Sequence, residues 1–313
     1  MRCDTVITLS RYYDITKKKK AMKRLVLLII FHFSLITYNF ALAQDRSLFI
    51  VHTSDTHSCI EPVSPNFTDS AMADKGGYMR RIVLFEKMRS EHPGNALFFD
   101  CGDFSQGSVY YNLYQGEVEV KLMNQMHYDA CTIGNHEFDF GLENLAKLMR
   151  MAEFPFVCCN YDFTGTPCEG LVKPYIIIER AGVRVGVLGV CPQPEGLITK
   201  HNYEGMGYTR PAKAAQPIID RLRDKEHCDI VVCLSHLGWD DKQDMDPDFI
   251  ANTTGLDVVL GGHSHTYFEA PQYVKDKRGH EVLVDHQGKN ACFVGTIEVG
   301  IGSPLSAPHF GEY

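Results

Sequence analysis

The chain has 313 residues, enough for one large domain or two small ones. Its 44% hydrophobic and 22% charged residues are the proportions of an ordinary globular protein. Lys and Arg number 31 against 39 Asp and Glu, a formal net charge of −8. Without the first 43 residues the balance is 23 against 37, a net charge of −14. Such a surface argues against nucleic-acid polymers as partners, because their binding needs clustered Lys and Arg.

The N-terminal segment has the order of features that directs a protein to export. A basic stretch ending at Arg24 precedes a mostly apolar run, residues 25–35, and a small-residue A-x-A site follows at residues 41–43. This order predicts a secretory signal peptide over residues 1–43, cleaved before Gln44, and therefore a periplasmic or extracellular protein. The apolar run is too short and too mixed to indicate a stable membrane span.

Two alternatives to this N-terminal interpretation stay open. Met22 can serve as the true start, in which case the first 21 residues reflect the choice of start site. A retained membrane anchor is the alternative to cleavage. After the signal peptide we expect one domain over residues 44–302 and a short tail over residues 303–313, where Pro304 and Pro308 occur without any periodicity.

Apolar periodicity in the mature part alternates between strands and helices. Early strands are expected at residues 48–52, 96–99, 130–133 and 156–159, with helices over 79–88, 118–126 and 142–151. A hairpin is expected from 175–179 and 184–188, then a helix over 212–225 with Pro217 near its first turn. Later strands are expected at 230–234, 258–260, 281–285 and 293–299. Strands that first alternate with helices and later form hairpins predict a mixed α/β fold of two packed mixed sheets with outer helices.

Ten of the eleven cysteines follow the signal peptide, and five of them lie inside or beside apolar runs: Cys101, Cys131, Cys191, Cys233 and Cys292. Buried free thiols behave as small hydrophobes. No pair has the spacing of a zinc knuckle or a C-x-x-C motif. We therefore expect mostly reduced, structural cysteines, which is unusual for an exported protein. A disulfide at Cys59 or Cys168 is the alternative.

Five short apolar segments each end in residues whose side chains bind metals. In chain order these residues are Asp55 and His57, Asp103, Asn135 with His136, His236, and His263 with His265. In α/β folds, binding groups gather at the carboxyl ends of strands, where loops are free to vary. This repeated pattern is the strongest functional signal in the sequence.

Imidazole nitrogens and carboxylate oxygens are ligands for divalent ions of the zinc or manganese type. Asp103 is the natural bridge, because a carboxylate has two oxygens and can span ions ~3.5–4 Å apart. Each residue alone has an ordinary explanation as a surface histidine or a turn-capping aspartate. Five coincident strand ends favour a joint metal site instead. The ordinary explanation is kept for His52, His127, His201, His227, His280, His286 and His309.

The motifs Asp55-x-His57, Gly102-Asp103, Gly134-Asn135-His136-Glu137, His236 and Gly262-His263-x-His265, in this order, resemble those of the calcineurin-like metallophosphoesterases. The stretch from Gly134 to Gly141 is similar to the 5′-nucleotidase branch, and the resemblance covers about residues 48–300. It implies a four-layer α-β-β-α fold and two divalent ions, Zn²⁺ or Mn²⁺. By this resemblance one ion is held by Asp55, His57, Asp103 and His265, and the second by Asp103, Asn135, His236 and His263.

The resemblance also implies a reaction, the hydrolysis of a phosphate ester, with nucleotides as the expected substrates. A metal-activated water attacks phosphorus in line while the ions clamp the phosphoryl oxygens. His136 is not a metal ligand in this pattern. It would stabilise the transition state or protonate the leaving oxygen, and Asp139 would orient it.

The resemblance leaves substrate recognition open. Full-length 5′-nucleotidases carry a second, C-terminal domain that binds the nucleoside, and this sequence stops at Tyr313. We expect either loose specificity or a separate chain that supplies the missing half. Alternatives on the same site are a 2′,3′-cyclic nucleotide phosphodiesterase, a nucleotide-sugar hydrolase or a thiosulfohydrolase. From other classes, the alternatives are a redox or metal-storage protein and a non-catalytic metal-binding subunit, and intact His136 and Asp139 argue against the latter.

Overall fold

The computed structural model describes residues 46–70, 72–240 and 242–301, together with Met22, Lys23 and Val26. The predicted signal peptide and C-terminal tail fall almost entirely outside the described residues and stay predictions. Within the described part of the chain, no helix combines the length and apolarity that crossing a bilayer requires.

Two six-stranded sheets form the centre of the domain. Across the first sheet the order is β14 (Gly295–Ile301), β1 (Arg46–Thr53), β2 (Ala96–Asp100), β3 (Ala130–Cys131), β4 (Phe156–Val157) and β6 (Val172–Lys173). Across the second it is β12 (Gln272–Lys275), β13 (Glu281–His286), β11 (Val258–Gly261), β10 (Ile230–Ser235), β8 (Val183–Val190) and β7 (Tyr175–Arg180). The inner strands are parallel, whereas β14, β12 and β7 pair antiparallel at the edges.

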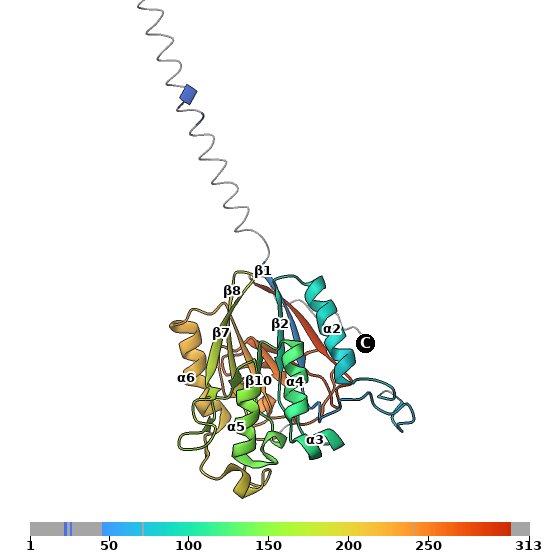
Figure 1. Ribbon diagram of the computed structural model, residues 1–313. Helices are drawn as coiled ribbons and strands as arrows, with labels where there is room; N and C mark the ends of the chain where they lie inside the picture. The colour runs from blue at the N-terminus through green and yellow to red at the C-terminus, as the bar shows by residue number, and fades with distance from the viewer. Residues whose placement is uncertain (1–21, 24–25, 27–45, 71, 241, 302–313) are drawn as a thin grey trace, which may run out of the picture. The chain divides into compact units, whose positions relative to one another are not determined.

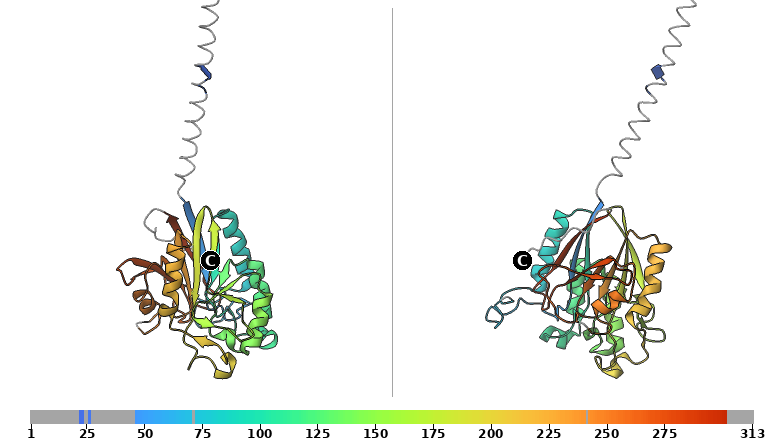
Figure 2. Two further views of the ribbon diagram at one scale, coloured as in Figure 1. Left: turned by 90° about the vertical axis from the view of Figure 1, so that its left-hand side faces the viewer. Right: turned by 180° about the vertical axis from the view of Figure 1, so that it is seen from behind.

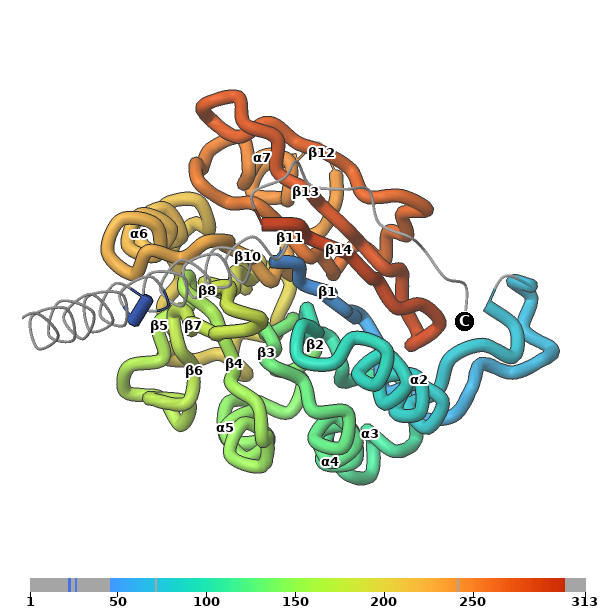
Figure 3. Tube along the Cα trace, turned by 90° about the horizontal axis from the view of Figure 1, so that it is seen from above, coloured from blue at the N-terminus to red at the C-terminus, as the bar shows by residue number. Residues whose placement is uncertain are grey.

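Helices cover the outer face of each sheet (Figures 1 and 3). On the side of the first sheet lie α2 (Tyr78–Glu91), α3 (Val109–Tyr114), α4 (Glu117–Met126) and α5 (Gly141–Met151). On the side of the second lie α6 (Pro211–Asp224) and α7 (Asp246–Ala251). The views in Figure 2 keep α6 and α2 on opposite sides of the sheets. The expected α-β-β-α arrangement of two mixed sheets flanked by helices is therefore confirmed.

The side chains of β1 show why its sequence is apolar at nearly every position. Leu48 and Ile50 face the second sheet, whereas Val51 packs toward the helices that cover the first. Because both faces of the strand are buried, alternation between apolar and polar residues is lost. The parallel register that pairs Val51 with Phe98 then brings the ends of β1 and β2 together.

Several short elements were not expected from the sequence. They include α3, α7, β12, the 3₁₀ helices η1 (His136–Phe138) and η2 (Lys200–Tyr203), and the small ladder of β5 (Tyr161–Asp162) with β9 (Gly207–Tyr208). The expected position of Pro217 was wrong. Pro211 starts α6, and Pro217 lies inside the helix on its exposed face. Water can satisfy the carbonyl that loses its intrahelical donor there, which lets the helix continue.

Candidate metal centre

The loops that follow β1, β2, β3, β10 and β11 hold the candidate ligands, because the carboxyl ends of these parallel strands lie at one end of the two sheets. Backbone hydrogen bonds extend the pairing of β1 and β2 into their loops. The Asp55 amide donates to the Gly102 carbonyl over 2.9 Å, and the His57 amide donates to the Asp103 carbonyl over 3.0 Å. The loop that carries His263 contacts the loop after β1. The His263 amide donates to both carboxylate oxygens of Asp55, at 3.0 and 3.1 Å.

The structure brings six of the seven predicted ligands into groups whose donor atoms lie within 4.8 Å of one another. One group contains Asp55, His57 and His265, a second contains Asp103, His236 and His263, and a third joins His57 and Asp103 to His136. The seventh, Asn135, precedes His136, whose amide donates to Asp103 over 2.9 Å. The Oδ1 atom of Asn135 is buried and has no hydrogen-bond partner.

The imidazole rings are oriented as metal ligands require. His236 donates from Nδ1 to the Cys101 carbonyl over 2.6 Å, so its Nε2 faces Asp103 Oδ2 at 3.1 Å. A bond of this kind keeps the proton on Nδ1 and leaves Nε2 as the nitrogen available to a metal ion. Nε2 of His57 and Nε2 of His265 point at each other over 2.8 Å. Mixed nitrogen and oxygen donors of this type fit divalent ions such as Zn²⁺ or Mn²⁺.

Burial controls the protonation of these groups. It raises the pKa of Asp55 to about 7 and lowers the pKa of His57 and of His263 to about 4. Burial would also lower the pKa of His236, but the carboxylate of Asp103 raises it to about 10. Burial opposes ionisation of Asp103 as well, but the charge and hydrogen bond of His236, together with the charges of His136 and His57, outweigh it, so the pKa of Asp103 falls below its usual value. In the protein alone Asp103 and His236 form an ion pair, and a divalent ion bound there would take the place of the proton.

Five of the seven candidate ligands have a left-handed backbone conformation that non-glycine residues rarely adopt. Their φ angles are 48° at Asp55, 45° at His57, 56° at Asp103, 74° at His263 and 58° at His265. Each such residue costs about 1–3 kcal/mol, and residues of this kind cluster at functional sites. The fold therefore bears strain where the candidate ligands converge.

Two glycines allow the loops after β2 and β3 to approach closely. A Cβ on Gly134 would lie 2.1 Å from Asp103 Oδ1, and a Cβ on Gly102 would lie 2.5 Å from the Gly134 nitrogen. Gly102 also has a φ of 88°. Any side chain at Gly134 would move Asp103 from its position between the candidate ligands.

Comparison with known proteins fits this geometry. A family model for calcineurin-like phosphoesterases matches residues 49–267, more than half of the chain. The chain belongs to the calcineurin-like phosphoesterases. This confirms the resemblance and the class of enzyme that it implies, a metal-dependent hydrolase of phosphate esters.

The relatives of this phosphoesterase include nucleotidases. The chain is 32% identical over 231 residues to the 5′-nucleotidase of Rattus norvegicus, covering 72% of this chain and 39% of the rat protein. It is 32% identical over 262 residues to a 2′,3′-cyclic-nucleotide 2′-phosphodiesterase/3′-nucleotidase of Haemophilus influenzae, covering 75% of this chain and 39% of that protein. The structure of a 5′-nucleotidase precursor from Thermus thermophilus has a TM-score of 0.74 at 31% identity, covering 84% of this chain and 53% of that one. The chain thus spans about two fifths to one half of the length of these relatives.

Glu137 is a further residue that shapes the candidate metal centre of this phosphoesterase, and the sequence analysis gave it no role. This side chain is 1% exposed and accepts three backbone hydrogen bonds. The amides of Asp103 and Gly134 donate to Oε2 at 2.9 and 2.6 Å, and the amide of Ser105 donates to Oε1 at 3.0 Å. Burial raises the pKa of Glu137 to about 7, and the amide donors oppose that rise. Glu137 therefore holds together the two loops that carry Asp103 and Asn135.

His136 lies beside the candidate ligands and forms a pair with Asp139. His136 Nδ1 is 3.1 Å from Asp139 Oδ2, and its ring centroid is 5.5 Å from that of His57. Burial alone would lower the pKa of His136, but the bond to Asp139 and the charge of Asp103 raise it. The side chain is 32% exposed, so solvent and small molecules can reach it.

Two histidines outside the centre, His52 and His286, are fully buried and paired with carboxylates. His52 Nε2 lies 2.8 Å from Asp285, and His286 Nε2 lies 2.8 Å from Asp246. Both pairs are enclosed in the protein, so the expectation that these two histidines are surface groups was wrong, and neither belongs to the groups of candidate ligands.

Lys289 is a further basic residue near the centre. Burial is the largest cause that lowers the pKa of His265, and the positive charge of Lys289 is the second. No motif in the sequence pointed to this lysine.

Proposed function

We propose that this phosphoesterase hydrolyses phosphate monoesters of nucleotides with two divalent ions held around Asp103. The main support is the convergence of donor groups on Asp103 from both sheets, in a chain whose relatives include 5′-nucleotidases. The proposed ligand sets are Asp55, His57, Asp103 and His265 for one ion, and Asp103, Asn135, His236 and His263 for the other. When bound, the ions would supply charge neutralisation on the phosphoryl oxygens and an activated water.

The remaining chemistry belongs to His136 and Asp139. Because Nδ1 of His136 is engaged by Asp139, its Nε2 is the nitrogen left to face a substrate. A raised pKa keeps more of the ring protonated, which suits donation of a hydrogen bond or a proton to the leaving oxygen. Asp139 would keep the ring in this orientation and stabilise its charge, as carboxylates do beside catalytic imidazoles.

The competing role for His136 is that of a metal ligand, since it lies within reach of His57 and Asp103. Replacement of His136 by Ala separates the two roles. As a proton or hydrogen-bond donor, His136 can be removed with metal content unchanged and turnover lowered by about 10²–10⁴-fold. The exposed His280→Ala is the matched control and should leave both quantities unchanged. Loss of metal from His136→Ala would contradict the proposed division of roles.

A second candidate function has comparable support from sequence similarity. The Haemophilus relative acts on 2′,3′-cyclic nucleotides according to its name, and its identity to this chain equals that of the rat nucleotidase. Release of phosphate from AMP, 2′,3′-cyclic AMP and 4-nitrophenyl phosphate by the Mn²⁺- or Zn²⁺-loaded protein distinguishes the two, with Asp103→Asn as the blank. For the cyclic substrate, conversion to the monoester is followed as well. We expect AMP to be the best substrate, and equal blank and wild-type rates on all three would overturn the proposal.

Export and a separate recognition chain are the two remaining parts of the proposal. Export depends on residues 1–43, and it is tested by N-terminal sequencing of the mature protein, which should begin at Gln44. The need for a recognition chain would be contradicted by a monomer that strongly prefers AMP over 4-nitrophenyl phosphate.

A further inference from the structure

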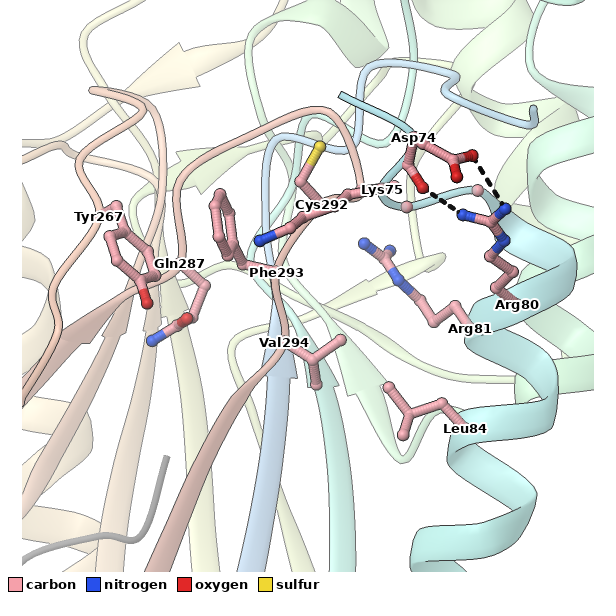
Figure 4. A pocket seen from close by; sticks show the side chains of 13 residues that line it. Asp74, Lys75, Arg80, Arg81, Leu84, Tyr267, Gln287, Cys292, Phe293 and Val294 are labelled. Atoms are coloured by element: carbon pink, nitrogen blue, oxygen red, sulfur yellow. Dashed lines mark hydrogen bonds and ion pairs between the residues drawn. The ribbon is translucent and has the colours of Figure 1, made fainter. Parts of the chain in front are cut away.

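A cavity of about 270 Å³ lies between α2 and the segment that leads into β14 (Figure 4). Leu84 and Val294 form part of its apolar wall, and the rings of Tyr267 and Phe293 pack against each other with centroids 4.4 Å apart. None of the proposed metal ligands lines this cavity. It is therefore a second concave site, distinct from the metal centre.

The unusual feature of the cavity is Arg81. Its side chain is buried, with 3% of the residue exposed, and Nε, Nη1 and Nη2 all lack a hydrogen-bond acceptor in good geometry. Figure 4 shows its guanidinium reaching from α2 into the space below Lys75 and Cys292. A buried cation without such acceptors is costly, so this arrangement calls for an anionic partner.

The neighbours of Arg81 in the protein supply that partner only in part. The Tyr78 ring offers only its face, with the guanidinium 5.7 Å from the centroid. The Tyr128 hydroxyl, which is also bonded to Thr53 over 2.8 Å, lies within reach of Arg81 and can accept a hydrogen bond from it, but it is neutral and supplies no charge. Asp100 interacts with Arg81 electrostatically, but its oxygens accept hydrogen bonds from Thr53 and from a backbone amide. The guanidinium keeps its planar set of N–H donors, which matches carboxylate and phosphoryl groups in a bidentate manner.

The other charged groups at the cavity strengthen its preference for anions. Asp74, the one acidic residue of the lining, is paired with Arg80 at 3.1 Å. Lys75 lies over the Phe293 ring at 5.7 Å from the centroid. The lining therefore carries three cations against one anion, although the whole chain has a net charge of −8. This local excess of positive charge is concentrated on a largely apolar cavity.

We propose that this cavity binds a small organic anion, a carboxylate or phosphoryl group on an apolar or aromatic body, with Arg81 as its anchor. A cavity of about 150 Å³ is enough to enclose benzene, so the larger volume has room for a ring and an oxyanion. The oxyanion would accept hydrogen bonds from the Arg81 guanidinium. The apolar body would lie against Leu84, Val294 and Phe293.

Binding of two probe anions to the full-length, metal-loaded protein tests the proposal. Benzoate presents a carboxylate and phenylphosphonate presents a phosphoryl group that cannot be hydrolysed as an ester, and both carry an aromatic ring. Calorimetric titration should show saturable binding of at least one of them, and their relative affinity identifies the favoured oxyanion. No binding of either at up to about 10 mM, beyond the range of a weak millimolar site, would overturn the proposal.

Three variants locate the binding. Arg81→Gln should weaken the affinity at least about tenfold, because it removes charged hydrogen bonds. Leu84→Trp keeps every charge but fills the cavity, so it should weaken the affinity about as much as Arg81→Gln does. It tests the proposal even if the loss of Arg81 disturbs folding. Lys87→Gln removes an exposed charge from α2 away from the cavity and should bind like wild type. Equal affinities in wild type and Leu84→Trp would place the anion elsewhere and contradict the proposal.

Discussion

Replacement of Glu137 by Gln tests whether one buried carboxylate holds the metal-centre loops together. Glu137 Oε2 accepts two backbone hydrogen bonds and Oε1 accepts one. Gln has nearly the same volume but replaces one oxygen with an NH₂ group that can only donate. In either orientation of the amide, at least one buried backbone N–H of the loops then faces another donor.

The size of the effect follows from these contacts. A buried donor that loses its acceptor costs about 1–3 kcal/mol, and the remaining bonds lose the benefit of a charged acceptor. We expect the free energy of unfolding to fall by about 2–4 kcal/mol. Because Glu137 fixes the Asp103 loop, we also expect metal affinity to fall about 10–100-fold, the usual range for residues that orient metal ligands.

Urea unfolding and Mn²⁺ titration of the same preparations measure both quantities. Glu143→Gln makes the same chemical change on α5, outside the metal-centre loops, and it should alter stability by no more than about 0.5 kcal/mol. A Glu137→Gln protein with the stability and metal affinity of wild type would refute the role assigned to these three hydrogen bonds.

Three other predictions follow from the packing and the site. Gly134→Ala should displace Asp103 and lower metal affinity in a Mn²⁺ titration, because the added Cβ would lie 2.1 Å from Asp103 Oδ1; wild-type affinity would contradict this. Leu97→Ala should cost about 2–5 kcal/mol in urea unfolding because Leu97 is fully buried between the sheets, whereas Leu113→Ala, 68% exposed, should cost about 0.5 kcal/mol or less. Equal costs would argue against the inter-sheet core. Chelation should lower the melting temperature, since each tenfold excess of free metal over its dissociation constant stabilises the fold by about 1.4 kcal/mol; a melting temperature unaffected by Mn²⁺ would refute this.

The sequence predicted the main strands and the residues at their ends for a simple physical reason. Strands such as β1 and β10 are buried on both faces, so they appear as continuous apolar runs. Parallel strands then place the residues that follow them at one edge, which allowed Asp55, Asp103 and His236 to be grouped before any geometry was known.

Other features depend on tertiary structure that no local pattern records. The left-handed conformation of Asp103 arises from loop packing, and the three partners of Glu137 come from two separate loops. Short elements such as α7 have too few residues for a periodic signal. The sequence analysis assigned no role to Arg81, and only the structure showed it to be buried without hydrogen bonds in good geometry.

The number of divalent ions bound per chain tests the central claim most directly. Metal analysis of the Mn²⁺- or Zn²⁺-loaded protein after removal of excess ions should give two ions for each chain. Asp103→Asn should lose binding at both positions, because Asp103 is the proposed shared ligand. One ion per wild-type chain, or two ions retained in Asp103→Asn, would contradict a centre built around Asp103.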